Sequence, residues 1–256
     1  MFKTVKYYTE MKTSRKRVRK PSDKPKKVTV KFFINKVVQA VIEGKEKRYP
    51  LYMLITYNRK NTMLRSLYGH YYKDLKEIDK KHYPGLLSFE ERTIKRTIAY
   101  ELSQQKENFD LKGINKKYEY YGLGIHVILS QHLKSQLWNV LMRLEPYAYA
   151  KALNFNDPDV EFETLFVIAK RVYKNLDELL PKDFEQLLEI FQTYAKLYRG
   201  SFFQYTFPTV IEWIDQSMLN DYRQKLEAIY KGDKSMINRS INQIDKVIQH
   251  NLFTVG

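Results

Sequence analysis

Four acidic side chains in one short stretch are the strongest candidates for chemistry in this sequence. Carboxylates at this spacing could hold a divalent cation through oxygen ligands, as a metal-dependent nuclease requires. The same stretch contains Asp157 followed by Pro158, the usual order of a helix N-cap and first helical residue. Acidic residues are also favoured there by the helix dipole. We therefore expect a helix start and keep the nuclease as an alternative. The four residues are Asp157, Asp159, Glu161 and Glu163.

No other group of residues indicates catalysis. The chain has no cysteine, which excludes thiol nucleophiles, zinc knuckles and iron–sulfur clusters. His126 and His132 are six residues apart, about 240° around a helix, so they would not share a metal ion. The sequence contains neither His-Glu-x-x-His nor Gly-x-Ser-x-Gly. It therefore predicts a protein that is not an enzyme, with no catalytic residue, metal or cofactor.

The chain is strongly basic, and the charge is unevenly placed. Lys and Arg number 45 and Asp and Glu 29, which gives +16 at pH 7. Residues 1–36 carry +11, residues 37–80 carry +4, and residues 81–256 carry only +1. Such a composition favours a polyanionic partner, either nucleic acid or an anionic membrane surface. Because the excess lies in the first third, we expect the binding function there.

Residues 1–27 are expected to form a flexible basic arm. The stretch from 12 to 27 reads KTSRKRVRKPSDKPKK, whose like charges repel and which has little apolar surface to bury. Such an arm would gain affinity by releasing counterions from phosphates, or would enter a minor groove. The alternative is a solvated tail without a partner. The arm residues expected to contact nucleic acid are Arg15, Lys16, Arg17 and Arg19.

Residues 28–84 are expected to form a small three-stranded antiparallel sheet, followed by a short helix from Tyr71 to Lys81. The segments 28–36, 49–57 and 62–68 are rich in β-branched and aromatic residues, which suits pleated strands. Gly44 and the polar run 58–61 mark turns between them. Alternation places Val30 and Phe32 on one face of the first strand and Lys31 on the other.

This stretch resembles the arm-type DNA-binding domain at the N-terminus of tyrosine recombinases (phage integrases), in the form common in Bacteroidetes mobile elements. The resemblance rests on the strand VTVKFFINK, the Gly44 turn, the segment YPLYMLITYNRK, and Thr62, Ser66 and Gly69. It implies a three-stranded sheet that lies against DNA and reads an accessory site. The side chains that would reach phosphates or base edges are Lys31, Arg59, Lys60 and Arg65.

The strand-transfer chemistry of that family is not expected here. Its catalytic domain needs a His-x-x-Arg element and a tyrosine nucleophile, and none of the five histidines is followed by Arg three residues later. The chain is also too short for an arm, a core-binding domain and a catalytic domain. The resemblance therefore implies DNA binding by the sheet alone.

Residues 85–256 are expected to form an α-helical domain. The clearest helix spans 123–144, where leucine and isoleucine recur at helical spacing. Ser88 and Glu91 have the spacing of a capping box and predict a helix start. Residues 108–122 are expected to form a loop. Asp233 is expected to cap the last helix, which would end near residue 249. The chain also has 21 tyrosines, some clustered among lysines as at Tyr71-Tyr72 and 118–121. Half-buried core positions are the favoured interpretation, and stacking of single-stranded bases the alternative.

The sequence thus predicts an α+β protein that is not an enzyme and that binds DNA, with RNA as the alternative ligand. It fits an accessory or regulatory factor of a mobile element or phage. Alternatives are a virion-associated phage protein with a genome-contacting tail, and the nuclease. The helical domain would bind a protein partner or a second copy. We expect no membrane association, since no apolar run of about 18 residues occurs, and a cytoplasmic location.

Overall fold

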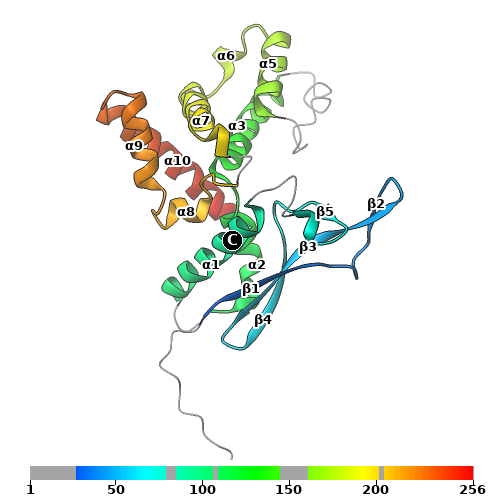
Figure 1. The fold of residues 1–256 in the computed structure, drawn as a ribbon. Helices are drawn as coiled ribbons and strands as arrows, with labels where there is room; N and C mark the ends of the chain where they lie inside the picture. The colour runs from blue at the N-terminus through cyan, green and yellow to red at the C-terminus, as the bar shows by residue number, and fades with distance from the viewer. Residues whose placement is uncertain (1–26, 79–84, 106–108, 145–160, 202–204, 256) are drawn as a thin grey trace, which may run out of the picture.

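The computed structural model describes residues 27–78, 85–105, 109–144, 161–201 and 205–255, and the side chains only as far as residue 250. A small antiparallel sheet comes first in the chain and helices follow, as Figure 1 shows. The α+β fold class predicted from the sequence is therefore confirmed. The division of the chain at residues 27/28 and 84/85 stays a prediction.

The sheet is built around one long strand. β3 (Glu46–Tyr57) pairs antiparallel with β1 (Thr29–Ile34) and with β4 (Lys60–Arg65), which gives the three-stranded meander expected from the sequence. Two short strands were not predicted. β2 (Val41–Glu43) pairs with the first residues of β3, and β5 (Tyr71–Tyr72) pairs with Tyr49 and Pro50.

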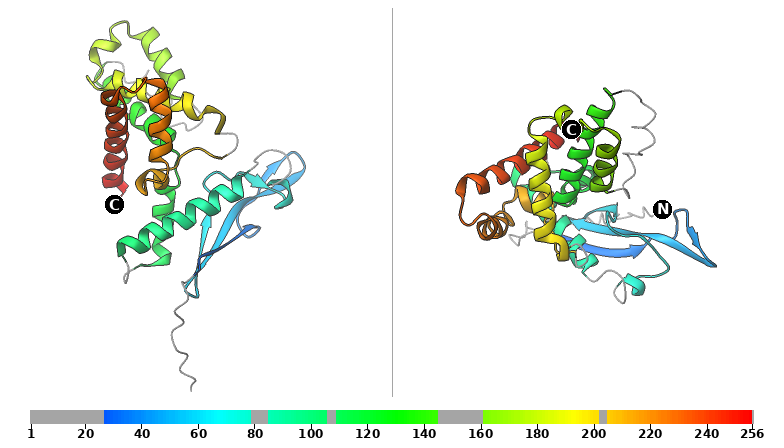
Figure 2. Two further views of the ribbon diagram at one scale, coloured as in Figure 1. Left: turned by 60° about the vertical axis from the view of Figure 1, so that its left-hand side comes forward. Right: turned by 90° about the horizontal axis from the view of Figure 1, so that it is seen from above.

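One face of the sheet forms the core with two helices. Alternate residues of β3, namely Leu51, Met53 and Ile55, are fully buried. Helix α1 (Leu86–Gln105) and helix α2 (Ile114–Tyr121), preceded by the 3-10 turn η2 (Leu111–Gly113), supply the apolar side chains that cover them. The left-hand view of Figure 2 shows α1 running along this face.

The remaining helices share a second, larger core. α3 lies at its centre, and its buried residues are the stripe that the sequence predicts, including Leu129, Leu133 and Leu137. Burial of such a stripe is the main force that holds short helices together in water. The helices are α3 (Ile125–Leu141), α5 (Phe162–Val172), α6 (Leu176–Leu179), α7 (Phe184–Tyr198), α8 (Val210–Ile214), α9 (Leu219–Ile229) and α10 (Lys234–Val255), with the 3-10 turn η3 (Arg199–Ser201).

Ion pairs join α1 of the sheet layer to α8 of the second core. Arg92 Nε lies 3.0 Å from Glu212 Oε1, and Arg96 Nη1 lies 2.7 Å from Asp215 Oδ2. Glu212 is buried and also completes a capping box with Thr209 at the start of α8. The sheet layer is therefore fastened to the helical part through charged groups as well as apolar contacts.

Three local predictions are wrong, two of them because contacts between residues distant in the sequence decide the structure. The expected helix from residue 71 begins instead as strand β5, where the buried Tyr72 pairs with β3. The expected loop at 108–122 contains α2, which buries Ile114 and Tyr118 against the sheet. Ser88 lies inside α1 and not at its N-cap, since the helix begins at Leu86.

Candidate nucleic-acid interface

The second face of the sheet is not covered by any helix among the described residues. Figure 2 shows α1 on one side of β1, β3 and β4 and no helix on the other. On this side, which we call the open face, the strand register places side chains in three rows across β1, β3 and β4. The rows are Thr29–Thr56–Asn61, Lys31–Leu54–Met63 and Phe33–Tyr52–Arg65.

Two of the predicted contact residues lie on the open face. Lys31 is exposed on β1, and Arg65 is exposed at the end of β4 in the neighbouring row. Arg65 Nη2 donates a hydrogen bond of 3.2 Å to Tyr71 Oη, and its guanidinium lies 5.6 Å from the centre of the Tyr71 ring. The contact restricts this arginine, which leaves less side-chain entropy to lose when it binds an anion.

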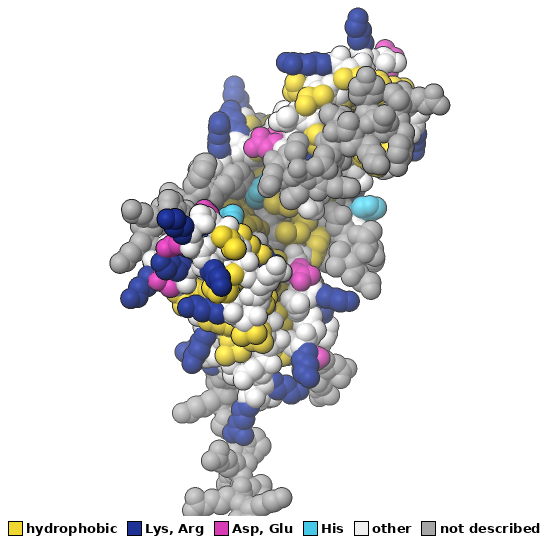
Figure 3. Space-filling model, turned by 90° about the vertical axis from the view of Figure 1, so that its right-hand side faces the viewer, with side chains coloured by type: hydrophobic (Ala, Val, Ile, Leu, Met, Phe, Trp, Pro, Cys, Tyr) yellow, Lys and Arg dark blue, Asp and Glu magenta, His cyan; other side chains and the backbone are white. Residues whose placement is uncertain are grey.

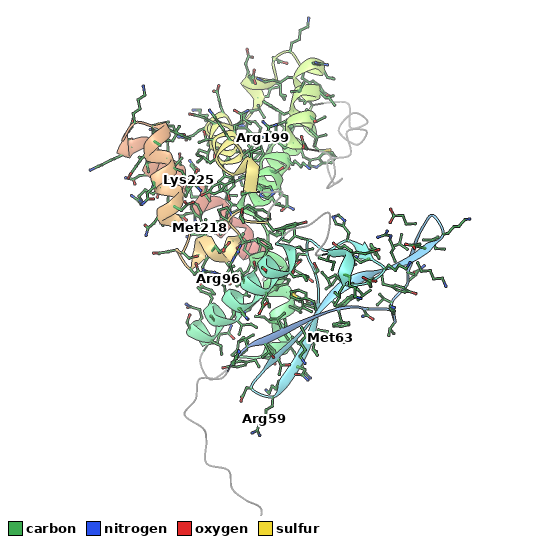
Figure 4. The ribbon with its side chains drawn as sticks, in the orientation of Figure 1. Arg59, Met63, Arg96, Arg199, Met218 and Lys225 are labelled. Atoms are coloured by element: carbon green, nitrogen blue, oxygen red, sulfur yellow. The ribbon has the colours of Figure 1, made fainter. Side chains whose placement is uncertain are left out.

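Arg59 occupies the tip of the β3–β4 hairpin. Asn58 and Arg59 are its two turn residues, with φ of 49° and 64°, the left-handed conformation that two-residue hairpin turns require. Figure 4 shows the Arg59 side chain pointing away from the sheet at this end. The cation is therefore presented beyond the edge of the protein, at the end of the open face that carries Thr56 and Asn61.

Lys60 does not join these cations on the open face. It pairs with Tyr57, whose ring packs edge-on against Phe109 at 5.7 Å on the side covered by α1 and α2. Its side chain is exposed only because it lies at the tip of the hairpin. The structure thus places Lys31 and Arg65 on the same face, on the two strands that flank β3. It places Arg59 at one end of this face and directs Lys60 to the other side.

The sheet region has an uncompensated positive charge. No Asp or Glu occurs from residue 24 to 42 or from residue 47 to 73, which includes all of β1 and β4 and most of β3. Among the described residues, none of the four predicted cations of the sheet forms an ion pair. Figure 3 shows Lys and Arg side chains around exposed apolar groups in this part of the molecule.

In the β2–β3 hairpin, in contrast, the arginine and both glutamates are paired. Arg48 Nε lies 2.7 Å from Glu43 Oε2, and Lys73 Nζ lies 2.6 Å from Glu46 Oε1. Arg48 also reaches Glu77 at 3.2 Å. Lys45 and Lys47 of the hairpin are exposed and form no ion pair among the described residues, so some free positive charge remains there. The open face differs in having no carboxylate on β1, on β4 or on β3 after Glu46.

A buried carboxylate holds the end of the open face in place. Glu90 of α1 accepts hydrogen bonds from the hydroxyls of Ser66 and Tyr118, and one of 3.1 Å from the backbone N–H of Tyr68. Burial raises the pKa of Glu90 above its usual value, although these hydrogen bonds act in the opposite direction. The bonds tie the chain directly after β4, and with it Arg65, to the helix behind the sheet.

Tyr68 makes a second link to the helical part. Its hydroxyl donates to the carbonyl of Gly122 and accepts from the N–H of Gly124, both at 2.9 Å. Its ring packs edge-on against Phe89 and Phe207 at 5.2 and 5.6 Å. These contacts of Tyr68 hold the sheet in place at the end of β4. None of them lies on the open face of the sheet.

The other predicted sites lie partly outside the described residues. Those residues exclude the arm positions Arg15, Lys16, Arg17 and Arg19, as well as Asp157 and Asp159. Glu161 and Glu163 are exposed at the start of α5. Within the described ranges no group of three or more His, Asp or Glu side chains could hold a metal ion.

Sequence reasoning missed the apolar part of the open face. Phe33, Tyr52 and Leu54 are half-buried there, and the Met63 side chain is 59% exposed. The signal was the two-residue period of a strand, which places Phe33, Tyr52 and Leu54 on the face opposite to Phe32 and Met53, the residues that pack in the core. The clustered tyrosines were expected to be half-buried. Tyr71 and Tyr121 are half-buried, and Tyr72, Tyr118 and Tyr120 are buried more deeply, in the core.

Comparison with known proteins finds no matching family model, no matching curated protein and no matching solved structure. Within the described ranges, no helix combines the length and apolar character needed to cross a bilayer.

Proposed function

We propose that this chain binds DNA through the open face of its sheet, assisted by the basic N-terminal segment. The observation that supports the proposal is the combination of Lys31, Arg65 and Arg59 on or beside one uncovered face with no carboxylate on that face. Phosphates would release condensed counterions when these cations bind them, which gives affinity without any sequence preference.

The proposed role is binding and not catalysis. An accessory or regulatory role in a mobile element or phage rests only on the resemblance to arm-type domains of tyrosine recombinases. The proposal itself needs no such context, because it depends on the charge and exposure of the sheet.

The test is equilibrium binding of the full-length chain to mixed-sequence DNA, duplex and single-stranded, across a salt titration. The variant combines Lys31→Ala, Arg59→Ala and Arg65→Ala. The control combines Lys196→Ala, Arg223→Ala and Arg239→Ala, which removes the same charge from exposed positions on α7, α9 and α10.

Loss of three phosphate contacts should reduce the slope of log affinity against log salt by about 2 to 3, whereas the control should keep the slope. The proposal fails if the chain binds no DNA at low salt, or if both triple variants behave alike.

A further inference from the structure

We infer that the open face takes unpaired bases, so that the preferred ligand of this site is single-stranded nucleic acid. The inference rests on the proposed function and deepens it by naming the class of ligand. The evidence for it is the set of aromatic and apolar side chains that lie between the cations of the open face. The proposal of DNA binding rests on the cations and does not use these side chains.

Two aromatic rings lie side by side on the open face. Phe33 of β1 and Tyr52 of β3 are register partners, and their ring centres are 6.0 Å apart with planes tilted by 37°. Both rings are half-buried, so each keeps part of its surface in contact with water instead of lying in the core. The tilt makes them two separate surfaces on which two bases could stack.

Apolar groups extend this surface along the sheet. Leu54 and Met63 are register partners in the next row, about 7 Å away along the strands. The Met63 side chain is 59% exposed on the central part of the open face, where it would contact water if nothing bound there. Apolar and aromatic side chains therefore occupy the centre of the open face.

Cations border this apolar centre. Lys31 ends one row on β1, and Arg65 ends the next row on β4, with the Tyr71 hydroxyl fixing its guanidinium. The arrangement has an aromatic and apolar centre with a positive rim, which is the pattern that binds single strands by stacking bases and pairing phosphates.

A duplex fits this centre less well than a single strand does. Paired bases are stacked on each other, so a duplex offers phosphates, sugars and base edges, and the faces of its bases are hidden. The apolar centre would then gain little from contact. Unpaired bases expose their faces, and removing one aromatic partner from such a site weakens binding by about five- to 150-fold.

The experiment compares three ligands of one mixed sequence: single-stranded DNA, single-stranded RNA and duplex DNA. Full-length wild type is measured beside Phe33→Leu and Tyr52→Leu, which keep an apolar side chain but remove the flat ring. The control is Tyr100→Leu, which removes a half-exposed tyrosine ring from α1. Circular dichroism and urea unfolding confirm that each variant is folded.

We expect wild type to bind a single strand at least tenfold more tightly than the duplex. Each open-face variant should weaken single-strand binding about tenfold and leave duplex binding unchanged, while Tyr100→Leu changes neither. The two single-stranded arms show whether DNA or RNA is the tighter ligand.

Tighter binding to the duplex, or equal losses for all ligands in the open-face variants, would overturn the inference but not the proposed function. Absence of binding to every nucleic acid would end both. A concentration-dependent dimer that Phe33→Leu abolishes would show that a second copy covers this face, and would also overturn the inference.

Discussion

The carboxylate of Glu90 on α1 accepts a hydrogen bond from the hydroxyl of Ser66, the residue that directly follows β4. Both side chains are buried, and Ser66 Oγ also accepts a hydrogen bond of 2.6 Å from the N–H of Gly69. A side chain at position 69 would not fit, since its Cβ would lie 2.4 Å from Ser66 Oγ. This polar junction sets how the sheet meets the helix behind it.

Glu90→Gln should change how stability depends on pH. Burial raises the pKa of Glu90 in the folded protein above its usual value of 4.5. Between that value and the raised pKa, the folded state holds a proton that the unfolded chain has released, so stability falls as pH rises. The variant cannot titrate, and its free energy of unfolding should fall less over this interval. Urea unfolding at a series of pH values measures the difference.

The control for that experiment is Glu91→Gln, which removes a half-exposed carboxyl group from the same helix. An identical pH dependence in wild type and Glu90→Gln would contradict the assignment of Glu90 as a buried, titrating group.

His126 should produce the opposite dependence in acid. Burial lowers the pKa of His126 to about 4 from 6.5, with its ring packed edge-on against Phe207 at 5.1 Å. Below pH 6.5 the unfolded chain takes up a proton that the folded chain refuses, so stability falls by up to about 3 kcal/mol as pH drops to about 4. His126→Phe should remove this loss, as thermal unfolding at pH 7 and pH 4.5 would show. A loss of the same size in the variant would count against a neutral, half-buried His126.

The two faces of the sheet should differ sharply in their response to the same substitution. Met53 is fully buried between β3 and the helices, whereas Met63 lies on the open face with its side chain 59% exposed. Met53→Ala should lower the free energy of unfolding by about 2–5 kcal/mol, because it leaves a cavity. Met63→Ala should change it by less than about 0.5 kcal/mol. Chemical unfolding of the two variants measures both changes. Equal losses of unfolding free energy would mean that both faces of the sheet are covered.

The strand pattern could be read from the sequence because alternation is local. Apart from Phe33 and Lys36, residues 28–36 alternate apolar and polar types, and the two faces predicted there are the core face and the open face of the structure. The placement of Lys31 on the exposed side followed from this alternation. The stripe of α3 was predictable for a similar reason, since helical spacing is visible in any window of the chain.

The parts that were missed depend on contacts distant in sequence. β5 forms because Tyr72 is buried against β3, and α2 forms because Ile114 and Tyr118 complete the sheet core. Neither segment has a strong pattern of its own. The direction of Lys60 was likewise unpredictable, because the two-residue turn at Asn58 and Arg59 sets the register that turns it away from the open face.

The central claim is that nucleic acid occupies the open face, and a label on that face tests it most directly. The chain has no cysteine, so Met63→Cys gives a unique site for an environment-sensitive fluorophore on the open face, and Arg223→Cys gives a control site on α9. Each labelled full-length protein is titrated with oligonucleotide at low salt. We predict a saturable signal change at position 63 that high salt reverses, and none at position 223. Binding detected by an independent method with no signal change at position 63 would contradict the account.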